Sequence, residues 1–192
     1  ARRGSPSARS KNHHGLREAS RQTEIGMNIF ISNRQRARKT DLRLLTEIAA
    51  SLLTELKIEE AELEINLVGA VEMAALNEKF LQHKGSTDVI TFDYRLSVGR
   101  DSRRAAKNEK RLARTLAPPY LSGEIFISVD DAMQQSKKFK TKWQSEIVRY
   151  IVHGILHLLG YDDLRADLRR KMKREENRLL RKLSRRFALS KL

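Results

Sequence analysis

Apolar residues recur along the chain with two different spacings, and each spacing predicts one kind of secondary structure. Residues 62–68 alternate charged or polar side chains with apolar ones, which is typical of a half-buried strand. Leu44, Ile48 and Leu52 instead repeat every four residues, which is typical of a helix with one buried face. Extended to the whole chain, these patterns predict strands at 27–32, 62–68, 87–92 and 123–128 and helices at 40–56, 71–80, 130–139, 142–159 and 164–186. A small mixed sheet packed with helices is therefore expected, which makes the fold α+β with three α/β-like layers.

The chain has 192 residues, of which 40% are hydrophobic, and this length suits one compact domain with tails. We expect a domain at 27–187, preceded by a basic extension at 1–26, interrupted by a basic insertion at 95–116 and followed by a short tail at 188–192. No run of about 18 apolar residues is present, so the sequence predicts no membrane span. The expected location is the cytoplasm, or an organelle if the Arg- and Ser-rich extension is a transit peptide.

Lysine and arginine number 39 and aspartate and glutamate 24, which leaves a formal net charge of +15. The excess lies in three segments, with 6 basic against 2 acidic residues at 1–26, 8 against 2 at 95–116, and 12 against 3 at 164–192. The remaining residues, which include the predicted core, are slightly acidic. Such peripheral basic segments favour a polyanionic partner, and nucleic acid in particular, over the alternative that charged tails only keep the protein in solution.

A pair of histidines provides the most specific chemical signal. His153 and His157 are four residues apart in a predicted helix, so both imidazoles project from one face and can bind one ion. Gly160 suits the end of that helix, after which the chain can fold back and bring Asp162 or Asp163 to the ion as a third ligand. Three protein ligands leave a coordination position open, as in catalytic metal sites, whereas the alternative is a pair of core histidines without an ion. Because the sequence has no cysteine, a metal must be held by histidine and carboxylate side chains.

Gly154 restricts the chemistry further. Zinc proteases of the HExxH type carry their general-base glutamate directly after the first histidine, and this chain has glycine at that position. Peptide hydrolysis by that route would lack its proton acceptor. The sequence therefore argues against a protease.

The segment 153–162, HGILHLLGYD, resembles the signature HGxLHLxGYDH of the YbeY family of metal-dependent endoribonucleases. Two further blocks occur in the same order along the chain. Residues 76–77 (LN) with 87–92 (TDVITF) resemble the family's LN…TDVLSF segment, and residues 123–128 (GEIFIS) resemble its GDIxIS strand. The match runs from residue 27 to about residue 183, apart from the insertion.

The resemblance implies an α/β fold in which three histidines hold zinc, and cleavage of single-stranded RNA during maturation and quality control of the small ribosomal subunit. In this chain Asp163 stands in place of the third histidine. The expected ligands of one zinc ion, or of another divalent transition metal, are therefore His153, His157 and Asp163. An anionic ligand lowers the net charge at the metal and makes a harder ion such as manganese less disfavoured. Ribosomal RNA and the small ribosomal subunit are the expected partners.

A second departure from the family pattern leads to an alternative function. The family usually carries an arginine five residues after the leucine of its LN pair, and this chain has Leu81 there, with His83 and Lys84 close by. Leucine cannot bind phosphate as the arginine fork does. The alternative is thus an RNA-binding ribosome-assembly factor with a structural or degenerate metal site. A metal hydrolase with another substrate is a third hypothesis, which the net charge of +15 disfavours.

Two polar residues next to the strand at 87–92 are candidate catalytic groups. Asp88 is a candidate proton acceptor and Thr87 a candidate for positioning the substrate, whereas the alternative for both is a hydrogen bond at the strand end. Trp143 and Tyr150 could stack on bases, but their position in a helix favours packing in the core.

Overall fold

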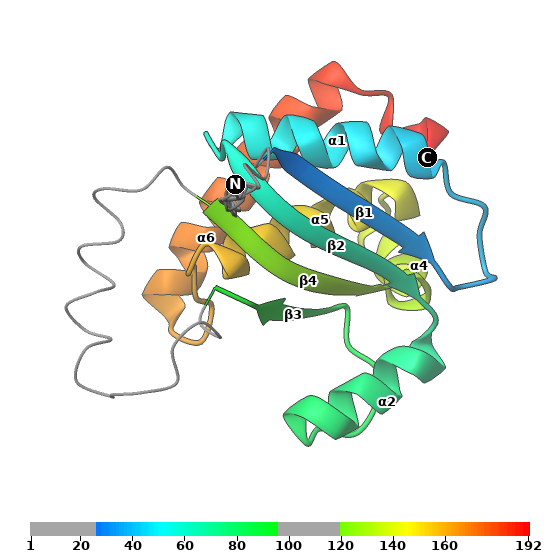
Figure 1. Cartoon of the computed structure of the whole chain (residues 1–192). Coiled ribbons are helices and arrows are strands. Elements are labelled where there is room, and N and C mark those ends of the chain that lie inside the picture. Colours follow the sequence, from blue (N-terminus) through cyan, green and yellow to red (C-terminus); the bar gives the residue numbers. More distant parts are fainter. Residues whose placement is uncertain (1–25, 96–119) are drawn as a thin grey trace, which may run out of the picture.

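The computed structural model describes residues 26–95 and 120–192, which build one sheet and the helices around it (Figure 1). Nearly all of the predicted extension at 1–26 and insertion at 95–116 lies outside the described residues. The strands are β1 (Met27–Asn33), β2 (Glu60–Val68), β3 (Val89–Asp93) and β4 (Tyr120–Ser128). The helices are α1 (Leu42–Glu55), α2 (Ala70–Leu81), α4 (Val129–Phe139), α5 (Trp143–Leu158) and α6 (Ala166–Arg186), followed by a short 3₁₀ helix (Leu189–Lys191).

The four strands form one sheet in the order β1-β2-β4-β3. β1, β2 and β4 are parallel, and β3 runs antiparallel to β4 at the edge. The predicted α+β class with a small mixed sheet is thereby confirmed. β4 begins earlier than predicted because Tyr120 already pairs with Glu60 of β2. β3 begins later than predicted, at Val89, which is the first residue that pairs with β4, opposite Ile127.

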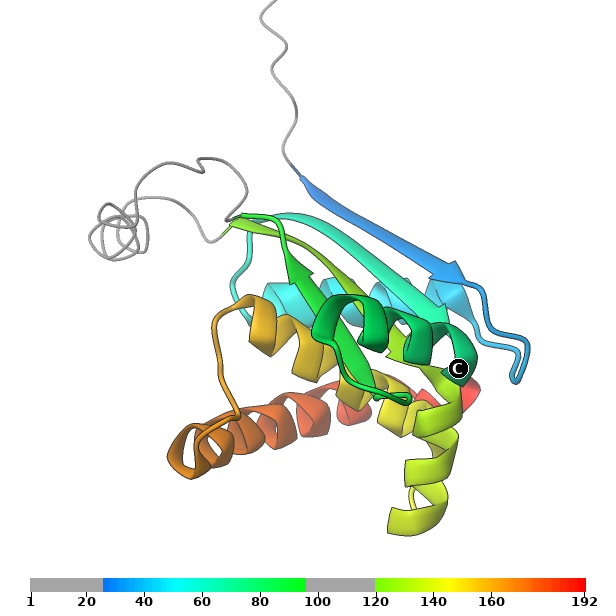
Figure 2. The same cartoon turned by 90° about the horizontal axis from the view of Figure 1, so that it is seen from below.

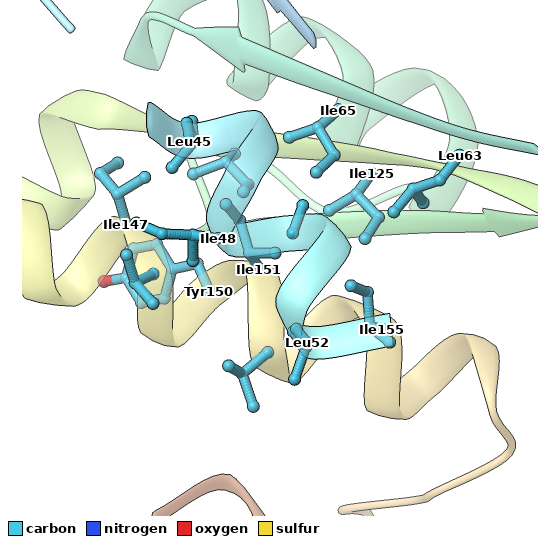
Figure 3. Packing of buried hydrophobic residues seen from close by; sticks show 14 of the residues in the cluster. Leu45, Ile48, Leu52, Leu63, Ile65, Ile125, Ile147, Tyr150, Ile151 and Ile155 are labelled. Atoms are coloured by element: carbon cyan, nitrogen blue, oxygen red, sulfur yellow. The ribbon is translucent and has the colours of Figure 1, made fainter. Parts of the chain in front are cut away.

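Helices cover one face of this sheet and only one end of the other, so the expected third layer is incomplete. Along the rest of that face Phe30 of β1 and Glu62 and Glu64 of β2 are exposed. α1 and α5 pack on one face, where Leu45, Ile48 and Ile151 of the helices belong to the same core cluster as Ile65 and Ile125 of the strands (Figure 3). α2 packs on the other face. The smaller cluster beneath α2 consists of Val68, Met73, Ile90 and Phe126. α6 lies on the outer side of α5 and also contacts α1 (Figure 2).

α5 is buried on most of its circumference, because it lies between the sheet and α6. Of its two aromatic residues, Tyr150 is only 4% exposed, so it packs in the core and cannot stack on a base. Gly154 faces β4, and a Cβ atom at that position would lie 2.9 Å from Cγ2 of Ile125. The helix can approach the sheet this closely only because residue 154 has no side chain. A glutamate would have no room there, which agrees with the argument against a protease.

α5 ends as its sequence predicts. Gly160 has a φ of +85°, a left-handed conformation that glycine adopts without steric cost. The N–H of Gly160 donates to the carbonyl of His157, and the N–H of Tyr161 donates to the carbonyl of Leu156. The chain therefore folds back beside the last turn of α5. Among the helices of residues 26–95 and 120–192, none is long and apolar enough to cross a lipid bilayer.

Candidate metal centre

Three side chains converge beside the C-terminal half of α5. The Nε2 atoms of His153 and His157 lie 3.0 Å apart, because four residues make about one turn of a helix. Asp163, in the segment that folds back after Gly160, places Oδ2 4.0 Å from Nε2 of His153. One ligand atom from each residue lies within 4.8 Å of the other two, so these residues could hold one metal ion. The structure thus brings together the three side chains that the sequence predicts as ligands.

Each imidazole is oriented through its other ring nitrogen. Nδ1 of His153 lies 3.3 Å from Oε2 of Glu176 on α6, and Nδ1 of His157 lies 3.1 Å from the carbonyl oxygen of Tyr161. Both partners are acceptors, so each Nδ1 carries the proton and each Nε2 keeps its lone pair. Such outer hydrogen bonds are typical of histidines that bind metals.

Glu176 is a buried carboxylate with three cationic or N–H partners. Its side chain is 4% exposed, and besides His153 it accepts hydrogen bonds from Arg149 Nη1 at 2.6 Å and from Lys173 Nζ at 2.7 Å. Arg149 is held in turn by Glu146 at 3.3 Å. Burial alone would raise the pKa of Glu176, but the hydrogen bonds from His153, Lys173 and Arg149 outweigh it and lower the pKa to about 2. Glu176 is therefore ionised at neutral pH.

The electrostatics favour neutral imidazole at the second ligand position. Burial, together with the charge of neighbouring His153 when that ring is protonated, lowers the pKa of His157 below its ordinary value. A metal ion binds the neutral ring. Because its pKa is lowered, His157 offers a metal ion less competition from protons than an exposed histidine does.

The donor set suits a divalent transition metal. Two imidazole nitrogens and one carboxylate oxygen form a three-ligand set of the kind found in catalytic zinc sites. The side chains of His153 and Asp163 are 24% and 40% exposed, so water and substrate can reach the ion on that side. The same donor atoms also accept manganese or iron, and they leave the identity of the ion open.

The two neighbouring aspartates have different roles. Oδ1 of Asp162 accepts the N–H of Leu164, which stabilises the turn before α6. Asp163 instead directs Oδ2 to the histidines. The spacing alone left both residues open as the third ligand, the family resemblance pointed to Asp163, and the geometry favours Asp163 as well.

The structure does not join the predicted catalytic pair to the histidines. Oδ1 of Asp88 accepts hydrogen bonds from the hydroxyl of Thr87 at 3.2 Å and from the N–H of Val89 at 3.0 Å, at the start of β3. Within the described parts of the chain, no hydrogen bond or ion pair connects Asp88 or Thr87 with the three candidate ligands. Their catalytic roles remain predictions.

Residues 30–184 match the family model described as endoribonuclease YbeY. The chain belongs to the YbeY family. An endoribonuclease YbeY from Acidothermus cellulolyticus is 34% identical over 155 residues, which cover 80% of this chain and 90% of the relative. Another, from Syntrophotalea carbinolica, is 32% identical over 154 residues, which cover 79% of this chain and 92% of the relative. The solution structure of a Thermotoga maritima protein has the same fold, with a TM-score of 0.51 and 21% identity over 81% of this chain and 88% of that one.

Sequence reasoning missed two residues that support the YbeY histidines, Glu176 and Arg149. A signal for Glu176 was present, because it falls on the buried stripe of α6 with Met172, Leu179 and Leu183. A carboxylate at a core-facing position is costly unless it is paired, so it suggests a buried partner. The position of Arg149 one turn before His153 gave no comparable indication of which residue it pairs with.

Proposed function

We propose that this chain is a metal-dependent endoribonuclease that cleaves single-stranded RNA during maturation of the small ribosomal subunit, with His153, His157 and Asp163 holding one zinc ion. The observation that carries the proposal is the convergence of three donor atoms, in a YbeY-family chain, with both histidines already oriented by acceptors on Nδ1. Two core histidines without an ion would not need a partly exposed carboxylate beside them. The cytoplasm is the proposed location, since that is where the subunit's RNA is processed in bacteria.

The ion would supply Lewis-acid chemistry, which polarises a phosphate oxygen and lowers the pKa of a bound water. The protein's part is to present the ligands. Glu176 keeps the proton of His153 on Nδ1, and the carbonyl of Tyr161 does the same for His157, so both Nε2 lone pairs point into the site. Asp163 adds a negative charge, which moderates that acidifying effect relative to three neutral ligands.

We assign proton transfer to Asp88, just before β3. In this proposal Asp88 accepts a proton from the attacking water, and Thr87 positions the RNA. What supports it is that one carboxylate oxygen of Asp88, Oδ1, is already held by two hydrogen bonds, which orients the other oxygen. An Asp88→Asn variant that keeps its metal and its RNA affinity but loses cleavage would fit this role, whereas unchanged cleavage would remove it.

The metal ligands are tested by elemental analysis of purified wild type, Asp163→Ala, Asp163→His and Asp162→Ala, each also assayed on a 5′-labelled single-stranded RNA. We expect about one transition metal per wild-type chain, loss of metal and cleavage in Asp163→Ala, and retention of metal in Asp163→His because imidazole can replace the carboxylate. Asp162→Ala is the matched control and should keep its metal, because Asp162 is engaged in the turn.

Two results would contradict the assignment. Wild type without metal after reconstitution would leave an RNA-binding assembly factor, the alternative that Leu81 motivates. Asp163→Ala with a full complement of metal would show that the third ligand lies elsewhere.

A further inference from the structure

α6 carries far more positive charge than it needs to stay folded. Between Ala166 and Arg186 it has 10 basic and 3 acidic residues. One side of the helix, with Met172, Glu176, Leu179 and Leu183, is buried against the domain. Seven of the ten basic residues form two groups, three that pair with carboxylates and four that do not.

The paired group attaches α6 to the rest of the domain. Arg178 contacts Glu175 at 2.6 Å and Glu55 of α1 at 2.9 Å, and Lys182 contacts the same Glu55. Lys173 pairs with Glu176 at 2.7 Å. These cations have structural partners, so their charge is largely compensated.

The second group consists of Arg170, Arg174, Arg181 and Arg185, which we call the arginine row. All four side chains are exposed, and none makes an ion pair with a carboxylate of residues 26–95 or 120–192. Their spacings of 4, 7 and 4 residues place them on one stripe, opposite the buried stripe of α6. The stripe is about 22 Å long, at a rise of about 1.5 Å per residue. Like charges one turn apart repel, so the row does not contribute to helix stability.

A groove beside the row shares one residue, Tyr161, with the support of the metal centre. It has a volume of about 500 Å³, and Tyr161, Lys171, Arg174 and Arg181 are among its lining residues. Lys171 Nζ lies 5.8 Å from the centroid of the Tyr161 ring. The carbonyl of Tyr161 is also the acceptor for Nδ1 of His157. A single residue therefore belongs to the wall of the groove and to the support of a candidate ligand.

We propose that the arginine row, on the outer side of α6, and the Tyr161 groove form a binding surface for the sugar–phosphate backbone of single-stranded RNA outside the metal centre. The identity of the nucleic acid rests on the proposed function. A guanidinium binds phosphate through two parallel N–H donors, and a row of four suits a polymer with regularly repeated phosphates better than a single small anion. An aromatic side chain in a cationic groove is typical of surfaces that bind single strands. The surface also supplies phosphate contacts that Leu81 cannot provide.

The test measures binding without catalysis. A fluorescent single-stranded RNA of about 20 nucleotides is titrated with metal-free protein between about 50 and 200 mM KCl, and binding is followed by anisotropy. The test variant combines Arg170→Gln, Arg174→Gln, Arg181→Gln and Arg185→Gln. The control variant combines Lys137→Gln, Lys138→Gln, Lys140→Gln and Lys142→Gln, which removes the same charge from exposed residues at the junction of α4 and α5. Thermal melting and metal content of both variants verify that they fold.

The arginine variant should bind at least about tenfold more weakly at low salt than wild type, and its plot of log affinity against log salt should be shallower by about 3, since each lost contact on a single strand removes about 0.7. The lysine control should stay close to wild type. On a long RNA substrate the arginine variant should show a raised KM and an unchanged kcat. Equal losses in both variants would mean that net charge alone drives binding, and they would overturn the proposal.

Failure of this surface and failure of the proposed function give different results. If no variant, including wild type, cleaves RNA but the arginine variant alone loses binding, the surface stands and the nuclease assignment falls. If both quadruple variants bind like wild type while wild type cleaves, the surface is overturned and the nuclease assignment stands. Poly-glutamate that displaces the RNA at the same charge concentration would assign the arginine row to acidic polypeptides, and would overturn the RNA proposal.

Discussion

α5 and α6 lie against each other, yet α5 buries most of its residues and α6 exposes most of its charged side chains. α5 has 10 of its 16 residues buried and carries its two histidines in a largely apolar C-terminal half. α6 has 4 of its 21 residues buried and exposes a row of arginines. A ligand set needs fixed positions, which close packing and outer hydrogen bonds provide. A surface that binds phosphates along a flexible strand needs accessible charge more than fixed geometry.

The two helices meet chemically at Glu176. This residue lies on α6, but its carboxylate contacts Arg149 and His153 of α5. The mostly exposed helix α6 thus contributes a buried carboxylate that holds side chains of α5. Substitutions in α5 or at Glu176 should therefore lower metal binding, and substitutions on the outer face of α6 should not.

The largest effect is expected from His157→Ala. This variant removes a ligand from the buried helix, so metal binding and RNA cleavage should fall by more than the roughly 100-fold typical of losing an outer hydrogen-bond partner. Elemental analysis and cleavage of labelled RNA measure both. The matched control is His83→Ala, since His83 is an exposed histidine in the loop after α2 and should not affect either quantity. Unchanged metal content in His157→Ala would exclude α5 as the site.

Glu176→Gln should have the next largest effect. The amide cannot balance the charges of Arg149 and Lys173, and it no longer favours a proton on Nδ1 of His153. Metal affinity, measured by competition with a chelator, should fall by about 10- to 100-fold. The control is Glu175→Gln on the same helix, whose carboxylate pairs with Arg178 instead. Equal affinities in the two variants would contradict the link between the helices.

Acid should weaken the junction at Glu176 in a defined pH window. The pKa of Glu176 is about 2 in the folded protein against an ordinary value of 4.5, so its ionised form contributes stability that is present above pH 4.5 and is lost as the pH falls towards 2. The contribution is up to about 3 kcal/mol, at about 1.4 kcal/mol per pKa unit. Urea unfolding of the metal-free protein between these pH values should show a steeper loss of stability in wild type than in Glu176→Gln. Parallel curves would mean that Glu176 is not ionised through its partners on α5.

The smallest effect is expected from Gly154→Ala, which tests the packing of α5. The new Cβ would lie 2.9 Å from Cγ2 of Ile125, so the helix or the strand must shift, although alanine favours a helix by about 1 kcal/mol over glycine. The net loss in unfolding free energy should be about 1–2 kcal/mol by urea denaturation. Gly26→Ala is the control, because a Cβ at Gly26 has no neighbour within 4 Å. A stabilised Gly154→Ala variant would show that α5 is less tightly packed than the structure indicates.

Much of the fold could be predicted because its signals are local. The alternation at β2 and the four-residue spacing in α1 specify strand and helix without any distant contact. The histidine pair was equally predictable, since residues four apart in a helix share a face wherever the helix lies. The strand order was not predictable in this way. β4 lies between β2 and β3 in the sheet, although it follows both along the chain, so this order depends on pairing between segments that are distant in sequence.

The sequence by itself determined the elements, the pair of imidazoles, the glycine that ends α5 and the excess of positive charge on α6. Only the tertiary structure decided how the acidic groups are arranged around the histidines. It separates Asp162, which accepts the N–H of Leu164, from Asp163, which faces His153, and it places Glu176 against the opposite nitrogen of the same ring. The physical reason is the distance along the sequence over which each effect acts. Periodicity and helical spacing act over a few residues, whereas the contact between a carboxylate and an imidazole on another helix depends on how the two helices pack.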